Sequence, residues 1–132
     1  MEIAETQGVD VVFADFGEAG ERVAGFCDFE SGKLYVNAND PVARQTFTIA
    51  HELGHWVLHR RFFEENPDEY SILPRFQKPS AKNPFEQEAN HFAANLLVPK
   101  RLLAPVKDAG ATVLAKVFGV SREMMENRLK NV

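Results

Sequence analysis

Residues 40–59 read DPVARQTFTIAHELGHWVLH, and the architecture of the chain follows from this segment. Asp40 is a good helix N-cap and Pro41 suits a first helical position, so we expect a helix over residues 40–63. Apolar residues cover most of its circumference, which is typical of a helix buried inside its protein. The remaining sector holds Thr48, His51, Glu52, His55 and His59. Polar side chains on a buried helix indicate a functional site.

Residues 51–55 form the motif H-E-x-x-H. Two residues four positions apart lie on one helix face, about 6 Å from each other, so the imidazoles of His51 and His55 can reach one metal ion. Zinc is the expected ion, one per chain. Glu52 lies about 100° around the helix from His51. It can therefore flank a water molecule at the metal without being a ligand, which is the position of a general base.

A catalytic zinc ion needs a third protein ligand. Asn83 and Glu86 form an N-x-x-E capping pattern that predicts a second helix, over residues 84–98. This helix offers Glu86, Glu88 and His91. We assign Glu86 to the capping box and favour Glu88, which borders the apolar stripe, as the third ligand. His91 is the alternative, and otherwise it is a partly exposed helix residue.

Strands are expected before the active-site helix and further helices after it. Within residues 1–39, Val9, Val11 and Phe13 alternate with other residues, which predicts a strand, and a hairpin signal follows around Gly32. Residues 66–83 contain three prolines and predict a loop, either a plain connector or a cover over the site. Residues 99–132 predict short helices. The expected fold class is therefore α+β, with a short, mainly antiparallel sheet, a central H-E-x-x-H helix and several further helices.

Composition places the chain among globular proteins. It has 132 residues, of which 45% are hydrophobic and 26% charged, and this predicts a single domain over 1–132. A single cysteine, Cys27, excludes an internal disulfide and suits a reducing compartment. Residues 1–10 lack the pattern of a secretory signal, and no stretch approaches the roughly 20 apolar residues of a membrane span. We therefore expect a cytoplasmic protein without membrane contact.

Charge is distributed unevenly along the chain. The net charge is −4, yet residues 100–132 contain seven basic and three acidic residues. This basic segment is either a solvated helix surface or a DNA-binding element over residues 114–129. Met124, Met125 and Leu129 suit burial against the rest of the protein. Direct DNA binding is therefore not expected.

Several segments of the sequence together resemble a known family, the ImmA/IrrE-type metallopeptidases. The resemblance covers roughly residues 20–130 and is carried by residues 34–37, 44–55, 58–59, 88–99 and 118–129. It implies a zincin-like fold in which His51, His55 and Glu88 bind zinc and Glu52 is the base. It also implies regulatory proteolysis, because family members cleave or disable helix-turn-helix repressors that are often encoded beside them. Their contexts are phage control, stress response and toxin–antitoxin-like pairs.

Five further residues are weaker candidates for the site. His59 lies one turn beyond His55 and either contacts a ligand, lines the cleft or closes the helix end. Tyr35 and Asn37 precede the active-site helix, where an edge strand of zincins aligns an extended substrate. Tyr70 could donate a hydrogen bond to an oxyanion. His91 is the fifth.

Two functions compete at this stage. The leading hypothesis is a zinc-dependent endopeptidase that performs regulatory cleavage of a protein partner, a helix-turn-helix (XRE-type) repressor or an antitoxin. The alternative is a non-proteolytic module of the same fold that binds and sequesters such a regulator. Glu52 favours the enzyme, because a purely structural zinc site needs no base.

Overall fold

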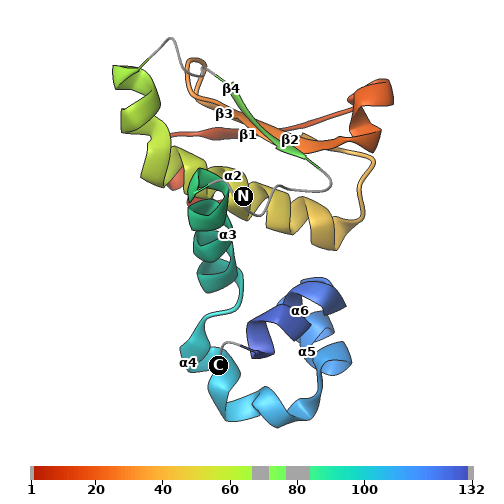
Figure 1. The fold of residues 1–132 in the computed structure, drawn as a ribbon. Helices are drawn as coiled ribbons and strands as arrows, with labels where there is room; N and C mark the ends of the chain where they lie inside the picture. The colour runs from red at the N-terminus through yellow and green to blue at the C-terminus, as the bar shows by residue number, and fades with distance from the viewer. Residues whose placement is uncertain (1, 67–71, 77–83, 131–132) are drawn as a thin grey trace.

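The computed structural model describes residues 2–66, 72–76 and 84–130. The long helix α2 lies against one face of a sheet, and the later helices continue away from that sheet (Figure 1). The first half of the chain forms α1 (Glu2–Thr6), β1 (Asp10–Ala14), the 3-10 helix η1 (Gly17–Glu21), β2 (Val23–Asp28), β3 (Lys33–Asn37) and α2 (Val42–Glu65). The second half forms β4 (Ile72–Phe76), α3 (Pro84–Leu97), α4 (Lys100–Leu103), the 3-10 helix η2 (Ala104–Ala109), α5 (Ala111–Phe118) and α6 (Arg122–Leu129).

The sheet has four strands in the order β1-β3-β2-β4. β2 and β3 form the predicted antiparallel hairpin, with Phe26 opposite Tyr35. Gly32 has a φ of 70° in the turn between them, a left-handed conformation that glycine adopts without a steric penalty. β1 runs parallel to β3, and β4 runs antiparallel to β2. The expected α+β class and the mainly antiparallel sheet are thus confirmed.

Strand β4 corrects the expectation of a loop over residues 66–83. Residues 72–76 pair with β2, with Pro74 opposite Phe26. Proline has no backbone N–H to donate and is tolerated at the edge of a sheet, which is where β4 lies. The three prolines therefore exclude a central strand but not this one. The expectation that this segment covers the site falls on its remaining residues, which lie outside the described residues.

The start of α2 also differs from the sequence expectation. The N-cap is Pro41, in extended conformation and without a side-chain hydrogen bond, so neither Asp40 nor Pro41 has its expected position. Asp40 instead lies 3.8 Å from the guanidinium of Arg44, and the amide of Gln45 donates to the carbonyl oxygens of Asn37 and Ala38. The side chain of Gln45 thus fixes the connection between β3 and α2.

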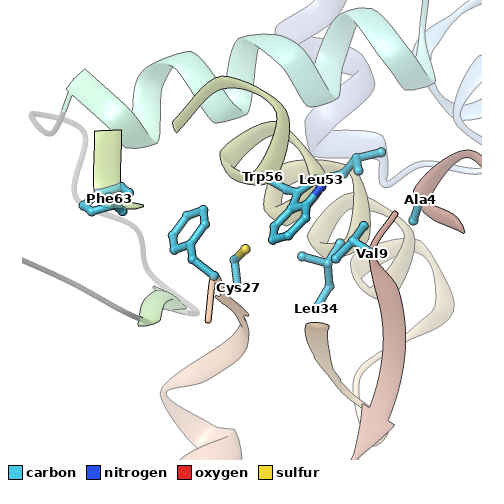
Figure 2. Packing of buried hydrophobic residues seen from close by; sticks show 8 residues of the cluster. Ala4, Val9, Cys27, Leu34, Leu53, Trp56 and Phe63 are labelled. Atoms are coloured by element: carbon cyan, nitrogen blue, oxygen red, sulfur yellow. The ribbon is translucent and has the colours of Figure 1, made fainter. Parts of the chain in front are cut away.

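The main core lies between α2, the sheet and α1, and Figure 2 shows its packing. It contains Ala4, Val9, Cys27, Phe29, Leu34, Leu53, Trp56 and Phe63. Gly25 lets α2 approach the sheet closely, because a Cβ atom there would lie 2.5 Å from Cγ2 of Thr48. The close approach at Gly25 places the turn of α2 just before His51 against β2.

The C-terminal helices form a second cluster around Val98, Leu103, Leu114, Ala115, Val120 and Met125. Gly119 ends α5 in a left-handed conformation, and Ser121 caps α6 by accepting a hydrogen bond from the backbone N–H of Met124. Arg128 is buried, and its guanidinium donates to the carbonyl of Val98 and to Oδ1 of Asn95. These bonds tie α6 to the C-terminal end of α3.

The longest helix, α2, has 24 residues but contains several arginines and glutamates. Within the described ranges, no helix combines the length and the apolar character that crossing a bilayer requires.

Candidate metal centre

Three side chains meet between α2 and α3. The Nε2 atoms of His51 and His55 lie 3.1 Å apart, and both face the carboxylate of Glu86. Oε2 of Glu86 is 2.9 Å from Nε2 of His51, and Oε1 is 3.0 Å from Nε2 of His55. Both imidazoles are fully buried, and Glu86 is 8% exposed. Two nitrogens and a carboxylate therefore converge on one buried point.

This donor set fits a zinc ion. Ligand atoms about 2.0–2.1 Å from a tetrahedral zinc lie roughly 3.3 Å from one another, close to the spacing of these three groups. Two imidazoles and one carboxylate make up the three protein ligands of one common class of catalytic zinc site, which leaves a fourth position open. His51, His55 and Glu86 would therefore hold the metal.

Glu88, the residue favoured from sequence as the third ligand, does not face this point. Its side chain is 58% exposed, and its Oε1 lies 3.7 Å from Nε2 of His59. The reason is the orientation of α3, whose buried positions are Glu86, Ala89 and Ala93. Glu88 lies about 200° around the helix from Glu86 and so faces another way. Glu86, which the sequence interpretation assigned to a capping box, directs its carboxylate to both imidazoles. Its partner in that box, Asn83, lies outside the described residues.

Gly54 allows α2 and α3 to approach closely enough for this arrangement. A Cβ atom on Gly54 would lie 3.1 Å from Cδ1 of Phe92 and 3.3 Å from Cα of Ala89. Most side chains would push α3 away and move Glu86 from the imidazoles. The glycine inside the H-E-x-x-H motif therefore has a packing role that involves both helices.

The outer nitrogen of each imidazole has its own partner. Nδ1 of His51 lies 2.8 Å from Oδ1 of Asn90, and Nδ1 of His55 lies 2.8 Å from Nδ1 of His59. An N–H donated from Nδ1 leaves the Nε2 lone pair available for a metal. The sequence interpretation did not identify Asn90. Its position, one helical turn after Glu86, was the signal that could have indicated it.

The protonation states at the site suit metal binding. Burial lowers the pKa of His55, and the neighbouring His51 acts in the same direction. The hydrogen bond that Glu86 accepts from His55 acts in the opposite direction. Burial alone would raise the pKa of Glu86, but its hydrogen bonds with His51 and His55 outweigh that effect and lower the pKa to about 2. A neutral His55 and an ionised Glu86 are the forms that bind a metal.

Glu52 is fully buried and lies at the same site. Its carboxylate and the candidate ligand atoms of His51 and His55 all lie within 4.8 Å of one another. Burial raises the pKa of the nearby Cys27 thiol, and the charge of Glu52 contributes to this shift. Cys27 is thus a buried neutral thiol of the core, and Glu52 is a second acidic group beside the imidazoles, in addition to Glu86.

The other candidates from sequence lie elsewhere. Tyr35 alternates with the buried Leu34 and Val36, so it lies on the sheet face opposite α2 and stacks on Phe26. Asn37 is buried and joins η1 to the end of β3, since its Nδ2 donates to the carbonyl of Gly20. His91 is exposed on α3, and Tyr70 lies outside the described residues. The structure therefore does not bring Tyr35, Asn37 or His91 to the imidazoles.

An open groove runs between α2 and α3 on the side of Glu88. It is lined by Leu58, Gln87, Glu88, His91, Phe92, Asn95 and Leu96. Leu58, an apolar residue of α2, is 48% exposed at the edge of this groove. The imidazoles of His51 and His55 do not line it.

The chain is similar to known proteins over most of its length. The model of the Peptidase_M78 family, described as the IrrE N-terminal-like domain, matches residues 4–130. "Uncharacterized immunity region protein 2" of Bacillus phage phi105 is 30% identical over 107 residues, which cover 78% of this chain and 63% of that protein. "Metallopeptidase ImmA" of Bacillus subtilis (strain 168) is 26% identical over 102 residues, which cover 77% of this chain and 55% of that protein. The chain spans less than two thirds of the length of either relative.

Proposed function

This chain belongs to the family of the IrrE N-terminal-like domain, a family of metallopeptidase-type proteins, and from that premise we propose that it is a zinc-dependent endopeptidase. The observation that carries the proposal is the convergence of His51, His55 and Glu86 on one buried point, with Glu52 beside them. These side chains supply a ligand set and a base, the two requirements of peptide hydrolysis by an activated water molecule.

Each residue has a defined task in this proposal. His51, His55 and Glu86 hold the metal, which when bound makes water a stronger acid and polarises a carbonyl group. Glu52 accepts a proton from the attacking water and returns it to the amine of the leaving peptide. Asn90 holds the ring of His51 through Nδ1 and so fixes the direction of its Nε2.

For the substrate we propose a helix-turn-helix repressor or antitoxin of the XRE type. One relative is named as an immunity region protein of a phage, and another is named ImmA, a metallopeptidase. A role in the control of a phage is in keeping with the first name, and peptidase activity is in keeping with the second. A peptidase would take part in this control by cleaving the repressor of the immunity region.

The substrate proposal is tested with the helix-turn-helix protein encoded nearest to the gene of this chain. The two purified proteins are incubated with Zn²⁺, and the products are identified by intact-mass spectrometry. We expect a single cut that depends on zinc and is abolished by a chelator. An intact partner under conditions in which the two proteins form a complex would contradict the peptidase assignment and favour sequestration. An intact partner that does not bind would exclude that substrate.

A further inference from the structure

His55 and His59 face each other through the same ring atom. Their Nδ1 atoms are 2.8 Å apart, and the ring centroids are 5.0 Å apart. His55 is fully buried, and His59 is 3% exposed. The ring of Phe85 packs edge to face on the ring of His59, with the two ring centroids 4.8 Å apart. The His59 imidazole is therefore held against Nδ1 of His55 and shielded from solvent, whereas it is Nε2 of His55 that faces Glu86.

Two Nδ1 atoms at this distance share one proton, because one atom must donate and the other accept. If Nε2 of His55 binds a metal, the single proton of its neutral ring is on Nδ1. Nδ1 of His59 is then the acceptor, and the proton of His59 is on its Nε2. The opposite arrangement places a proton on Nε2 of His55, the atom that faces Glu86. The tautomer of His59 therefore decides whether His55 can be a ligand.

Glu88 supplies the preference for one tautomer. Its Oε1 lies 3.7 Å from Nε2 of His59, and among the described residues Nε2 of His59 has no hydrogen-bond partner. A carboxylate near this atom favours a proton on Nε2 rather than on Nδ1. The side chains of Glu88, His59 and His55 thus form a series of contacts that leads from the exposed face of α3 to the buried site. Each group in this order determines which nitrogen of the next one carries the proton.

We propose that His59, supported by Glu88, is a positioning residue that holds His55 in the tautomer with Nε2 available for the metal. The inference deepens the proposed function and rests on it, because it concerns the same metal site. It assigns to Glu88 an indirect role two residues away from the ligand Glu86. It also explains why a third histidine lies on α2 one turn after the second.

The test compares two substitutions of His59 in the whole chain. His59→Asn places an amide oxygen near the position of Nδ1, so it retains an acceptor for His55. His59→Leu fills similar space without an acceptor. Zn²⁺ affinity is measured by competition with a chromophoric chelator, and the visible absorption of bound Co²⁺ reports ligand geometry. We expect His59→Leu to bind zinc about 10–100-fold more weakly and to change the Co²⁺ spectrum, and His59→Asn to remain within a few-fold of wild type.

Thermal unfolding of the metal-free proteins separates positioning from packing. If Leu and Asn reduce zinc affinity equally, in proportion to a loss of stability, His59 only packs and the inference is wrong. Unchanged affinity in His59→Leu also overturns it. Should His59→Leu not fold, the exposed Glu88 provides the second comparison, because Glu88→Leu removes an acceptor that Glu88→Gln retains. If Glu88→Leu binds zinc more weakly than wild type and Glu88→Gln does not, the inference is supported. If the two variants bind zinc equally, it is contradicted.

Wild-type protein separates this inference from the proposed function. If wild type binds no zinc, the metallopeptidase proposal itself fails. If wild type binds zinc and His59→Leu binds it equally well, only the positioning role fails.

Discussion

Glu86→Gln should abolish tight zinc binding, whereas Glu88→Gln should retain it. Glutamine has nearly the shape of glutamate but offers a neutral amide in place of the carboxylate that faces both imidazoles. With one of three ligands lost, we expect affinity to fall by a factor on the order of 10² or more, since even loss of a residue that orients a ligand costs about 10–100-fold. Elemental analysis after dialysis measures the retained zinc.

Glu88→Gln is the matched control, because it makes the same chemical change two residues along the same helix. Its side chain is 58% exposed, so the substitution should leave the fold intact. The amide oxygen keeps an acceptor near Nε2 of His59, and zinc occupancy should remain close to one per chain. Zinc loss in Glu88→Gln together with full occupancy in Glu86→Gln would reverse the assignment and restore Glu88 as the ligand.

Glu52→Gln should separate zinc binding from chemistry. The amide keeps the length of the side chain but cannot accept a proton at neutral pH. Since we propose Glu52 as a base and not as a ligand, zinc occupancy should be unchanged. Removal of a general base lowers the rate by about 10²–10⁴, so turnover of a cleaved partner should fall by that factor. Single-turnover cleavage followed by mass spectrometry measures it.

Two results would contradict this role of Glu52. Cleavage at the wild-type rate would show that another group takes the proton. Loss of zinc from Glu52→Gln would show that the carboxylate is a ligand, as its presence within 4.8 Å of both imidazole ligand atoms allows. Binding of the partner without cleavage, by wild type and variant alike, would favour the sequestering module.

Local signals were sufficient for much of the architecture. The hairpin of β2 and β3 follows from alternation around a turn at Gly32, and the end of α5 and start of α6 follow from Gly119 and Ser121. The burial of α2 follows from apolar residues on most of its faces, and residues 48–56 are indeed all buried. These features depend on residues near one another in sequence.

Apart from the start of α2, the errors concern contacts between distant segments. Glu86 and Glu88 both lie on α3, and only the packing of Ala89 and Ala93 on α2 decides which of them faces the histidines. A capping pattern explains a glutamate at position 86 equally well when α3 is considered alone. Strand β4 was missed because Pro74 excludes a central strand, and the sequence does not reveal that β2 leaves an edge for it. Identification of Asn90 as the partner of His51 also required knowledge of how α3 packs on α2.

The most direct measurement of the central claim is anomalous X-ray scattering at the zinc absorption edge from crystals of the zinc-loaded protein. The account predicts one peak about 2.0–2.2 Å from Nε2 of His51, Nε2 of His55 and a carboxylate oxygen of Glu86, with Glu88 directed toward His59. A peak coordinated by Glu88 in place of Glu86, or zinc bound away from His51 and His55, would contradict it.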